Sequence, residues 1–194
     1  EETRDILFVG GFNHPPNVDA ICWFARDVLP LVCEACPDIR VHVVGSNPTE
    51  AVESLQDDRV VVYGYLSDQE LDDLYGRTRQ VIAPLRFGAG VKGKVLEAIQ
   101  KNRPLVTTSI GMEGIPHADT VMHIADSADE FAARVIEIHR GDAAALAKVE
   151  AYPAWLQSHF GKARAARIIR EDFGPPEKTL PLSGQCEPML QVAE

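Results

Sequence analysis

The chain has 194 residues, a length that suits one domain with a long tail or two small domains. Apolar residues make up 45% and charged residues 25%, which is typical of a soluble globular protein. A net charge of −10 argues against nucleic acid as a partner, because phosphate backbones attract basic surfaces. No signal peptide or membrane-spanning apolar run is visible, so we expect a cytoplasmic protein.

Short apolar runs alternate with segments of helical periodicity along the first half of the chain. The run from Ile6 to Gly10 suits a strand buried on both faces. Asn17 is a good N-cap, and the helix after it should end near Pro37. There follow a strand at Arg40 to Gly45, a short helix at Pro48 to Gln56 and a strand at Val60 to Tyr63.

The second half continues this alternation. Its predicted elements are a helix opened by a capping box at Ser67 and running to about Tyr75, strands at Gln80 to Ala83, Pro104 to Thr107 and Val121 to Ile124, and a helix from a second box at Ser127 to Arg140, with Gly141 as its stop. Between the first two of these strands lies a further helix that begins near Val91. The pattern predicts an α/β fold with a six-stranded parallel sheet.

The end of the chain differs in composition. Two helices are expected from Asp142 to Phe173, broken near Tyr152-Pro153. From Gly174 onward prolines and scattered polar residues predict a poorly ordered tail, so we expect a domain over 1–173 and a tail over 174–194. The chain opens at Glu1 without a methionine, and we expect it to be a fragment of a longer protein.

The cysteines carry a weak signal. Cys33 and Cys36 have the spacing of a redox motif, but they fall at the end of a predicted helix before Pro37. We therefore favour reduced thiols over a metal or redox role.

The strongest functional signal is the stretch from Ala83 to Asn102. It holds a glycine-rich loop with Gly88, Gly90 and Gly93. Lys92 and Lys94 stand where a helix begins, and cations there oppose the helix dipole. An anion bound at the helix start would explain them, and phosphate is the natural guest. The stretch matches neither a P-loop nor a convincing dinucleotide fingerprint. A plain loop with ordinary surface ion pairs is the alternative.

Four segments carry a family resemblance, and they read FVGGFNHPPNVDAICWF, PDIRVHVVGSNP, VYGYLSD and APLRFGAGVKGKVLEAIQKNRPLVTTSIGMEGI. In this order they resemble the carboxyl-terminal half of group 1 retaining glycosyltransferases of the two-Rossmann-domain (B-type) architecture. The resemblance covers about Asp5 to Phe173. It implies a Rossmann-like three-layer sandwich that binds a nucleoside diphosphate sugar, with the acceptor-binding amino-terminal domain absent from this chain.

The resemblance also implies roles for individual residues. Glu97 matches the glutamate that grips the ribose hydroxyls, because a carboxylate accepts two hydrogen bonds from a diol. Lys92 and Lys94 match basic positions that would contact the diphosphate and stabilise it as it leaves, which makes them the catalytic candidates. The other substrate-binding candidates are Gly11, Phe12 and Asn13 in the first loop, Tyr65 in the base-binding loop Tyr63 to Leu66, Arg86 as a third phosphate contact, Gly90 and Val91 through their N–H groups, and Glu113 after the fifth strand.

The sequence departs from the family pattern at two places. Ala89 stands where many members carry the first of two glutamates, and Asn13 and His14 replace the usual Arg and Lys of the first loop. His14 could hydrogen-bond a ligand or stabilise the turn before Pro15, and Arg86 could equally be a solvated side chain.

The expected function is transfer of a sugar from a nucleoside diphosphate to an acceptor, in surface polysaccharide or glycoconjugate synthesis. The isolated half should bind the donor without transferring it. We expect no cofactor and no metal, since the resemblance implies that lysines replace the divalent cation. A non-catalytic nucleotide-sugar-binding or interaction module, or half of an epimerase or phosphorylase, are the alternatives. Peripheral membrane association of the full-length protein stays open.

Overall fold

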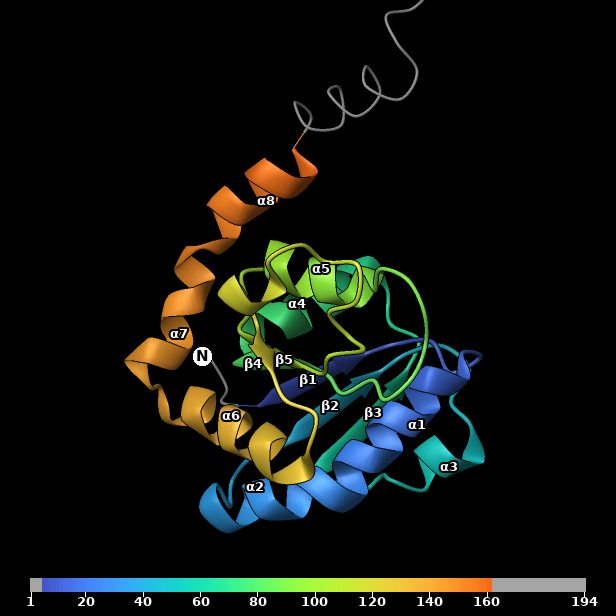
Figure 1. Ribbon diagram of the computed structural model, residues 1–194. Coiled ribbons are helices and arrows are strands. Elements are labelled where there is room, and N and C mark those ends of the chain that lie inside the picture. The colour runs from blue at the N-terminus through green and yellow to red at the C-terminus, as the bar shows by residue number, and fades with distance from the viewer. Residues whose placement is uncertain (1–4, 162–194) are drawn as a thin grey trace, which may run out of the picture. The chain divides into compact units, whose positions relative to one another are not determined.

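The computed structural model describes residues 5–161, and Figure 1 shows how their elements are arranged. Six parallel strands form one sheet in the order β3-β2-β1-β4-β5-β6, which confirms the predicted Rossmann-like α/β fold. The strands are β1 (Ile6–Val9), β2 (Val41–Val44), β3 (Val60–Gly64), β4 (Gln80–Ala83), β5 (Leu105–Thr107) and β6 (His123–Ile124).

Helices cover both faces of this sheet (Figure 1). On one face lie α1 (Pro15–Trp23), α2 (Leu29–Ala35) and α6 (Ala128–Arg140), and on the other lie α4 (Asp68–Arg77) and α5 (Gly93–Gln100). Two hydrophobic cores form, each a separate cluster of buried apolar side chains. Because side chains alternate along a strand, Ile6 and Phe8 of β1 join one core while Leu7 joins the other. The remaining helices are α3 (Glu50–Glu53), a 3-10 turn at Ala118–Thr120, α7 (Ala143–Glu150) and α8 (Tyr152–Phe160).

The first helix differs from its prediction at both its start and its middle. It begins at Pro15 with His14 as N-cap, so the prediction that Asn17 caps it is wrong. Proline fits the first helical position because its missing N–H would have no partner there. Between α1 and α2 the residues Phe24–Val28 form a π-helical stretch. Pro30 follows it and offers no N–H to continue the α-helical ladder, which accounts for the widened turn.

Other boundaries agree more closely. The predicted capping box at Ser67 is present, with both of its reciprocal bonds to Glu70, and Gly141 ends α6 with a φ of 78°. The predicted helix start at Val91 is wrong, because α5 begins at Gly93 and Val91 is 51% exposed in the preceding loop. The break near Tyr152 is confirmed by the start of α8. The predicted boundary at residue 173 and the tail lie outside the described residues.

At one position in the sheet, two neighbouring strands are followed by helices on opposite faces. β1 pairs with β2 on one side and with β4 on the other. The chain leaves β1 into α1 on one face and leaves β4 into α5 on the opposite face (Figure 1). The two loops therefore diverge at the carboxyl ends of β1 and β4, a place called the switch point, which is where open parallel sheets hold their ligands.

Candidate functional site

Lys94 reaches from the first turn of α5 to the carboxyl end of β1. Its ammonium lies 4.8 Å from the centre of the Phe8 ring. It donates a hydrogen bond of 2.5 Å to Oδ1 of Asn17 in α1. A side chain from one face of the sheet thus meets a side chain from the other face across the end of β1.

Burial lowers the pKa of Lys94 to about 8, well below the usual value of a lysine. Among residues 5–161, no carboxylate forms an ion pair with its ammonium. A cation that is partly removed from water and lacks a counter-ion is costly to the fold. Such a group is suited to attract an anionic ligand.

Lys92 is held differently. It is the N-cap residue of α5, and its side chain is 11% exposed. Its ammonium bonds to the Gly90 carbonyl and lies 3.5 Å from a carboxylate oxygen of Glu113. The two lysines therefore differ, since Lys92 already has a carboxylate nearby and Lys94 does not.

A cavity of about 210 Å³ lies between the first loop and the glycine-rich loop. Its lining residues are His14, Pro16, Asn17, Leu85, Ala89, Val91, Lys92, Gly93 and Lys94. The structure thus brings three predicted site residues, Val91 and the two lysines, to one cavity. A larger hollow of about 470 Å³ lies beside the edge strand β6, away from the switch point.

The start of α5 offers backbone donors to this cavity. The N–H groups of Val95 and Leu96 already bond to the carbonyl of Lys92. The N–H groups before them, on Gly93 and Lys94, belong to the orphan donors that every helix start presents. No acidic residue stands in this first turn. The positive end of the helix dipole and both lysines therefore all favour a negative charge at this place.

Gly90 has a φ of 76°, in the left-handed region that favours glycine. Its neighbour Val91 packs toward Gly114, where an added Cβ would lie 2.9 Å from Cγ2 of Val91. The glycine-rich loop is therefore in contact with the loop that carries Glu113.

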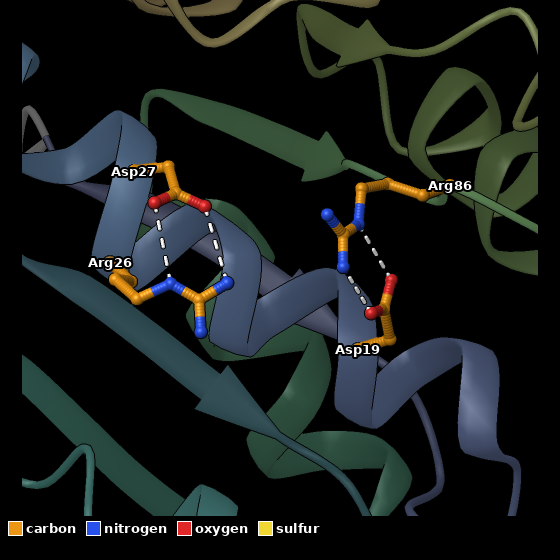
Figure 2. A network of polar contacts seen from close by, with 4 residues as sticks. All are labelled: Asp19, Arg26, Asp27 and Arg86. Atoms are coloured by element: carbon orange, nitrogen blue, oxygen red, sulfur yellow. Dashed lines mark hydrogen bonds and ion pairs between the residues drawn. The ribbon is translucent and has the colours of Figure 1, made fainter.

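Arg86 lies apart from the cavity lining. Its guanidinium forms a forked ion pair with the Asp19 carboxylate of α1 (Figure 2). It also lies over the ring of Trp23, at 5.8 Å from the ring centre. The Arg86 pairing lowers the pKa of Asp19. Figure 2 shows a second, separate pair between Arg26 and Asp27, which are neighbours in the π-helical stretch. The proposed phosphate contact of Arg86 stays a prediction.

Glu97 lies one turn further along α5. It is half-buried, and burial raises its pKa, with Asp72 and Asp68 adding to the rise and Lys101 opposing it. The hydroxyl of Tyr75, whose side chain is buried, has no hydrogen-bond partner among the described residues. The assignment of Glu97 to a ribose stays a prediction.

The first loop presents backbone more than side chains. Phe12 is buried and stacks on Phe8, so only its main chain is available to a ligand. Gly11 and Asn13 are exposed. The Phe12 N–H bonds to the carbonyl of Ser46, in the loop after β2, over 2.9 Å.

The end of β3 and the loop after it contain one tyrosine with a hydrogen-bond partner and one at the surface. The Tyr63 hydroxyl lies 2.9 Å from Nδ1 of His42, and Nε2 of His42 lies 2.9 Å from Asp5. Tyr65 is 76% exposed. It is not among the residues that line the cavity, so the structure does not bring it together with the lysines.

The remaining features bear little on this site. Burial raises the pKa of both Cys33 and Cys36, the opposite of what a reactive thiol pair requires. In the part of the chain that the structure describes, no cluster of His, Cys, Asp and Glu has a metal-binding arrangement. Over the same residues, every helix is too short or too polar to cross a bilayer.

Sequence reasoning missed two residues of this region, Asn17 and Asp19. The sequence predicts only a capping role for Asn17, and it predicts no role for Asp19. Their partners Lys94 and Arg86 lie 77 and 67 residues away in the chain. The only sequence signal for Asn17 is a polar residue between Pro16 and an apolar helical stripe, which is also what an N-cap looks like.

Comparison with known proteins places this geometry in context. The sequence profile of the family described as "Glycosyl transferases group 1" matches residues 3–140. An uncharacterized 44.6 kDa protein in the cps region of Klebsiella pneumoniae is 33% identical over 117 residues. That match spans 57% of this chain and 30% of the Klebsiella protein, so the chain corresponds to under a third of its relative.

Several solved structures have a similar fold. The C-terminal domain of a group 1 glycosyl transferase, LpcC of Francisella tularensis, has a TM-score of 0.65 at 14% identity, over 83% of this chain and 88% of that domain. WaaG, a glycosyltransferase of lipopolysaccharide biosynthesis, has a TM-score of 0.65 at 17% identity, over 90% of this chain and 48% of its own. A TarM mutant of S. aureus, crystallised with UDP, has a TM-score of 0.66 at 12% identity, over 84% and 34%.

Proposed function

Because this chain belongs to the family of group 1 glycosyl transferases, we propose that it is the half that binds the nucleoside diphosphate sugar donor. In this proposal the diphosphate occupies the cavity at the switch point and contacts Lys94, Lys92 and the first N–H groups of α5. The similarity to the C-terminal domain of LpcC supports this half of the architecture.

The observation that carries the proposal is that Lys94 is partly buried without a counter-ion among the described residues. Its ammonium is partly buried beside the end of β1, and within residues 5–161 it has an amide partner but no carboxylate partner. A lysine at the positive end of a helix dipole is repelled by that dipole. A diphosphate would supply the missing negative charge, and the dry surroundings would strengthen that attraction.

The chemistry that follows is departure of a nucleoside diphosphate from a sugar. The bond between the anomeric carbon and the diphosphate oxygen breaks, and the oxygen keeps the electron pair. The diphosphate gains charge as the bond lengthens, so Lys94 and Lys92 would bind it more tightly in the transition state than in the ground state. Removing one such donor costs about a hundredfold or more in rate in other enzymes. We expect no metal to be required for this step.

The other candidates take supporting roles in this proposal. Glu97 would accept hydrogen bonds from the ribose hydroxyls, and Tyr65 would lie near the base. Gly90 and Val91 would donate backbone N–H groups, and the loop with Gly11, Phe12 and Asn13 would border the sugar. Glu113 would act through its contact with Lys92.

The whole protein's activity is a further step of the proposal. We infer that a longer protein transfers the sugar with retention of configuration to an acceptor held by a second domain. The cps-region relative and the lipopolysaccharide glycosyltransferase WaaG support a role in surface polysaccharide synthesis. This chain by itself would bind donor without transferring it, because closure of two domains over the donor is what excludes water.

A panel of nucleoside diphosphate sugars tests this function. Saturation-transfer NMR with the 194-residue chain should give signal from one or more of these donors, and inorganic pyrophosphate should compete with them. The protons nearest to the protein should identify which base and sugar are in contact. Failure of every donor and of pyrophosphate to bind would refute the proposal.

Ala89 favours one alternative. It lines the cavity at the position where many relatives carry a glutamate, so the cavity lacks that carboxylate. A non-catalytic module that binds a nucleotide sugar would fit this change. Sugar transfer by the full-length protein, and its loss on replacing Lys94, would exclude this alternative.

A further inference from the structure

Asn17 joins the two loops of the switch point through a single side chain. Its amide nitrogen donates to the Gly11 carbonyl over 2.7 Å, and its amide oxygen accepts from the Lys94 ammonium over 2.5 Å. The residue is only 5% exposed, so both contacts are partly shielded from water.

The chemistry of the amide fixes its orientation. A carbonyl can only accept and an ammonium can only donate. The NH₂ group of Asn17 must therefore face Gly11, and its oxygen must face Lys94. In the reverse orientation the NH₂ group would face the ammonium, donor against donor, and the amide oxygen would face the Gly11 carbonyl, acceptor against acceptor. No other residue type of this size offers one donor and one acceptor in this arrangement.

The main chain at Gly10 also lies close to the Lys94 ammonium. A Cβ atom built on Gly10 would lie 2.4 Å from the Lys94 ammonium and 2.8 Å from Cγ of Asn17. The Phe8 ring lies beneath the ammonium at 4.8 Å. A ligand can reach Lys94 from the cavity that His14 and Lys92 also line.

We propose that Asn17 is a positioning residue, which holds the Lys94 ammonium over the end of β1 and couples it to the first loop. This inference rests on the proposed function, because it assigns the diphosphate contact to Lys94. It adds that the contact depends on a residue of α1, so a lysine on one face of the sheet is held in place by an amide on the other face.

The inference predicts a specific pattern for inorganic pyrophosphate binding to the chain. Asn17→Ala removes both contacts, and Asn17→Leu keeps a similar size but offers neither a donor nor an acceptor. Each should weaken pyrophosphate binding about tenfold or more, since each removes the ordered charged hydrogen bond. Gln100→Ala, which removes an exposed amide from α5, is the matched control and should bind as the parent does.

A double-mutant cycle separates positioning from a general structural effect. In a Lys94→Ala background, Asn17→Ala should cost nothing further, because there is no ammonium left to position. Thermal unfolding should show that each variant is folded. If Asn17→Ala does not fold, Asn17→Leu, which has a similar size, carries the test.

The pH dependence of binding gives a second readout. The parent should bind pyrophosphate more weakly as the pH rises above about 8, the pKa of Lys94. In Asn17→Ala the released lysine becomes hydrated, so this break should move up toward 10.5, the ordinary value. The titratable groups that face Lys94 across the cavity are His14 and Lys92, and the break should persist in His14→Gln.

The outcomes are distinguishable. If a folded Asn17→Ala or Asn17→Leu variant binds like the parent while Lys94→Ala is impaired, Asn17 does not position the lysine and the proposed function stands. An Asn17→Ala effect that persists in the Lys94→Ala background also overturns the inference. If Lys94→Ala itself binds like the parent, the proposed function fails.

Discussion

Gly10 and Lys94 lie in direct contact, although they are far apart in the chain and belong to different elements. A Cβ atom on Gly10 would come within 2.4 Å of the Lys94 ammonium. A glycine at the end of β1 therefore leaves the space that the lysine occupies. The position of the Lys94 side chain therefore depends on the absence of a side chain at Gly10.

Gly10→Ala should displace Lys94 and Asn17 without removing either. We expect nucleoside diphosphate binding to weaken about tenfold or more, because the charged hydrogen bond between those residues is lost. Gly76→Ala in α4 is the control, since nothing lies within 4 Å of the added Cβ. That control should bind normally and gain roughly 0.4–1 kcal/mol of stability. Calorimetric titration measures the first effect, and unchanged binding in Gly10→Ala would contradict the proposed contact.

Lys94 should make the fold less stable at neutral pH. Its pKa is about 8 in the folded state and near 10.5 when unfolded, so between these values the unfolded chain holds more protons. The free energy of unfolding should therefore rise with pH across that window, and the cost of burying the ammonium is fully present below it. Because the side chain keeps some contact with water, we estimate this cost at roughly 1–3 kcal/mol.

Lys94→Met should consequently be more stable than the parent near neutral pH. The advantage should disappear as the pH rises through the same window, because the parent lysine then loses its proton. Urea unfolding at several pH values measures this difference. Lys101→Met is the matched control, since Lys101 pairs with Asp72 and lies at the far end of α5. An advantage that grows with pH would show that the sign of the pKa shift is wrong.

Arg86 should anchor the glycine-rich loop to α1 through Asp19. Arg86→Ala and Asp19→Asn should lower the free energy of unfolding by similar amounts, under about 1 kcal/mol, because both side chains are partly exposed. The pairing lowers the pKa of Asp19, so its contribution is present above the ordinary carboxyl pKa and is lost as the pH falls through the lowered value.

The same pair of variants tests the other interpretation of Arg86. Nucleoside diphosphate titration of both should show nearly equal affinities if the residue acts only as an anchor. A loss of affinity in Arg86→Ala that is absent from Asp19→Asn would instead establish Arg86 as a phosphate contact.

Glu97 should discriminate between nucleotides and bare pyrophosphate. Glu97→Gln should weaken nucleoside diphosphate binding about tenfold, because a neutral amide is a poorer acceptor for the ribose hydroxyls. Pyrophosphate has no ribose and should bind Glu97→Gln as it binds the parent. Burial raises the pKa of Glu97, so nucleotide affinity should also fall as the pH drops through that raised value. Glu34→Gln on α2 is an exposed control, and equal losses for both ligands would reject the ribose role.

The sheet could be predicted from sequence because its signals are local. Each buried strand is a short apolar run, and Ser67 and Gly141 mark helix ends through contacts with near neighbours. The start of α1 was misplaced because two chemistries compete there. Both a proline in the first turn and an asparagine N-cap are good helix starts, and Pro15 prevailed while Asn17 bonded elsewhere.

The site could be predicted only in part, for a physical reason. Lys92 and Lys94 stand out locally, because cations at a helix start oppose the dipole. Their different states depend on distant partners, Glu113 for one and Asn17 for the other. Periodicity carries no information on such contacts, which form only when α1 and α5 emerge on opposite faces of the same sheet.

The most direct test of the account is a calorimetric titration of nucleoside diphosphate into Lys94→Ala and Lys101→Ala. One variant removes a lysine from the first turn of α5 and the other removes the lysine at its C-cap, so the net charge changes equally. The account predicts that Lys94→Ala loses about tenfold or more in affinity, while Lys101→Ala binds like the parent. Equal affinities for the parent and both variants would contradict the claim that Lys94 at the switch point holds the diphosphate.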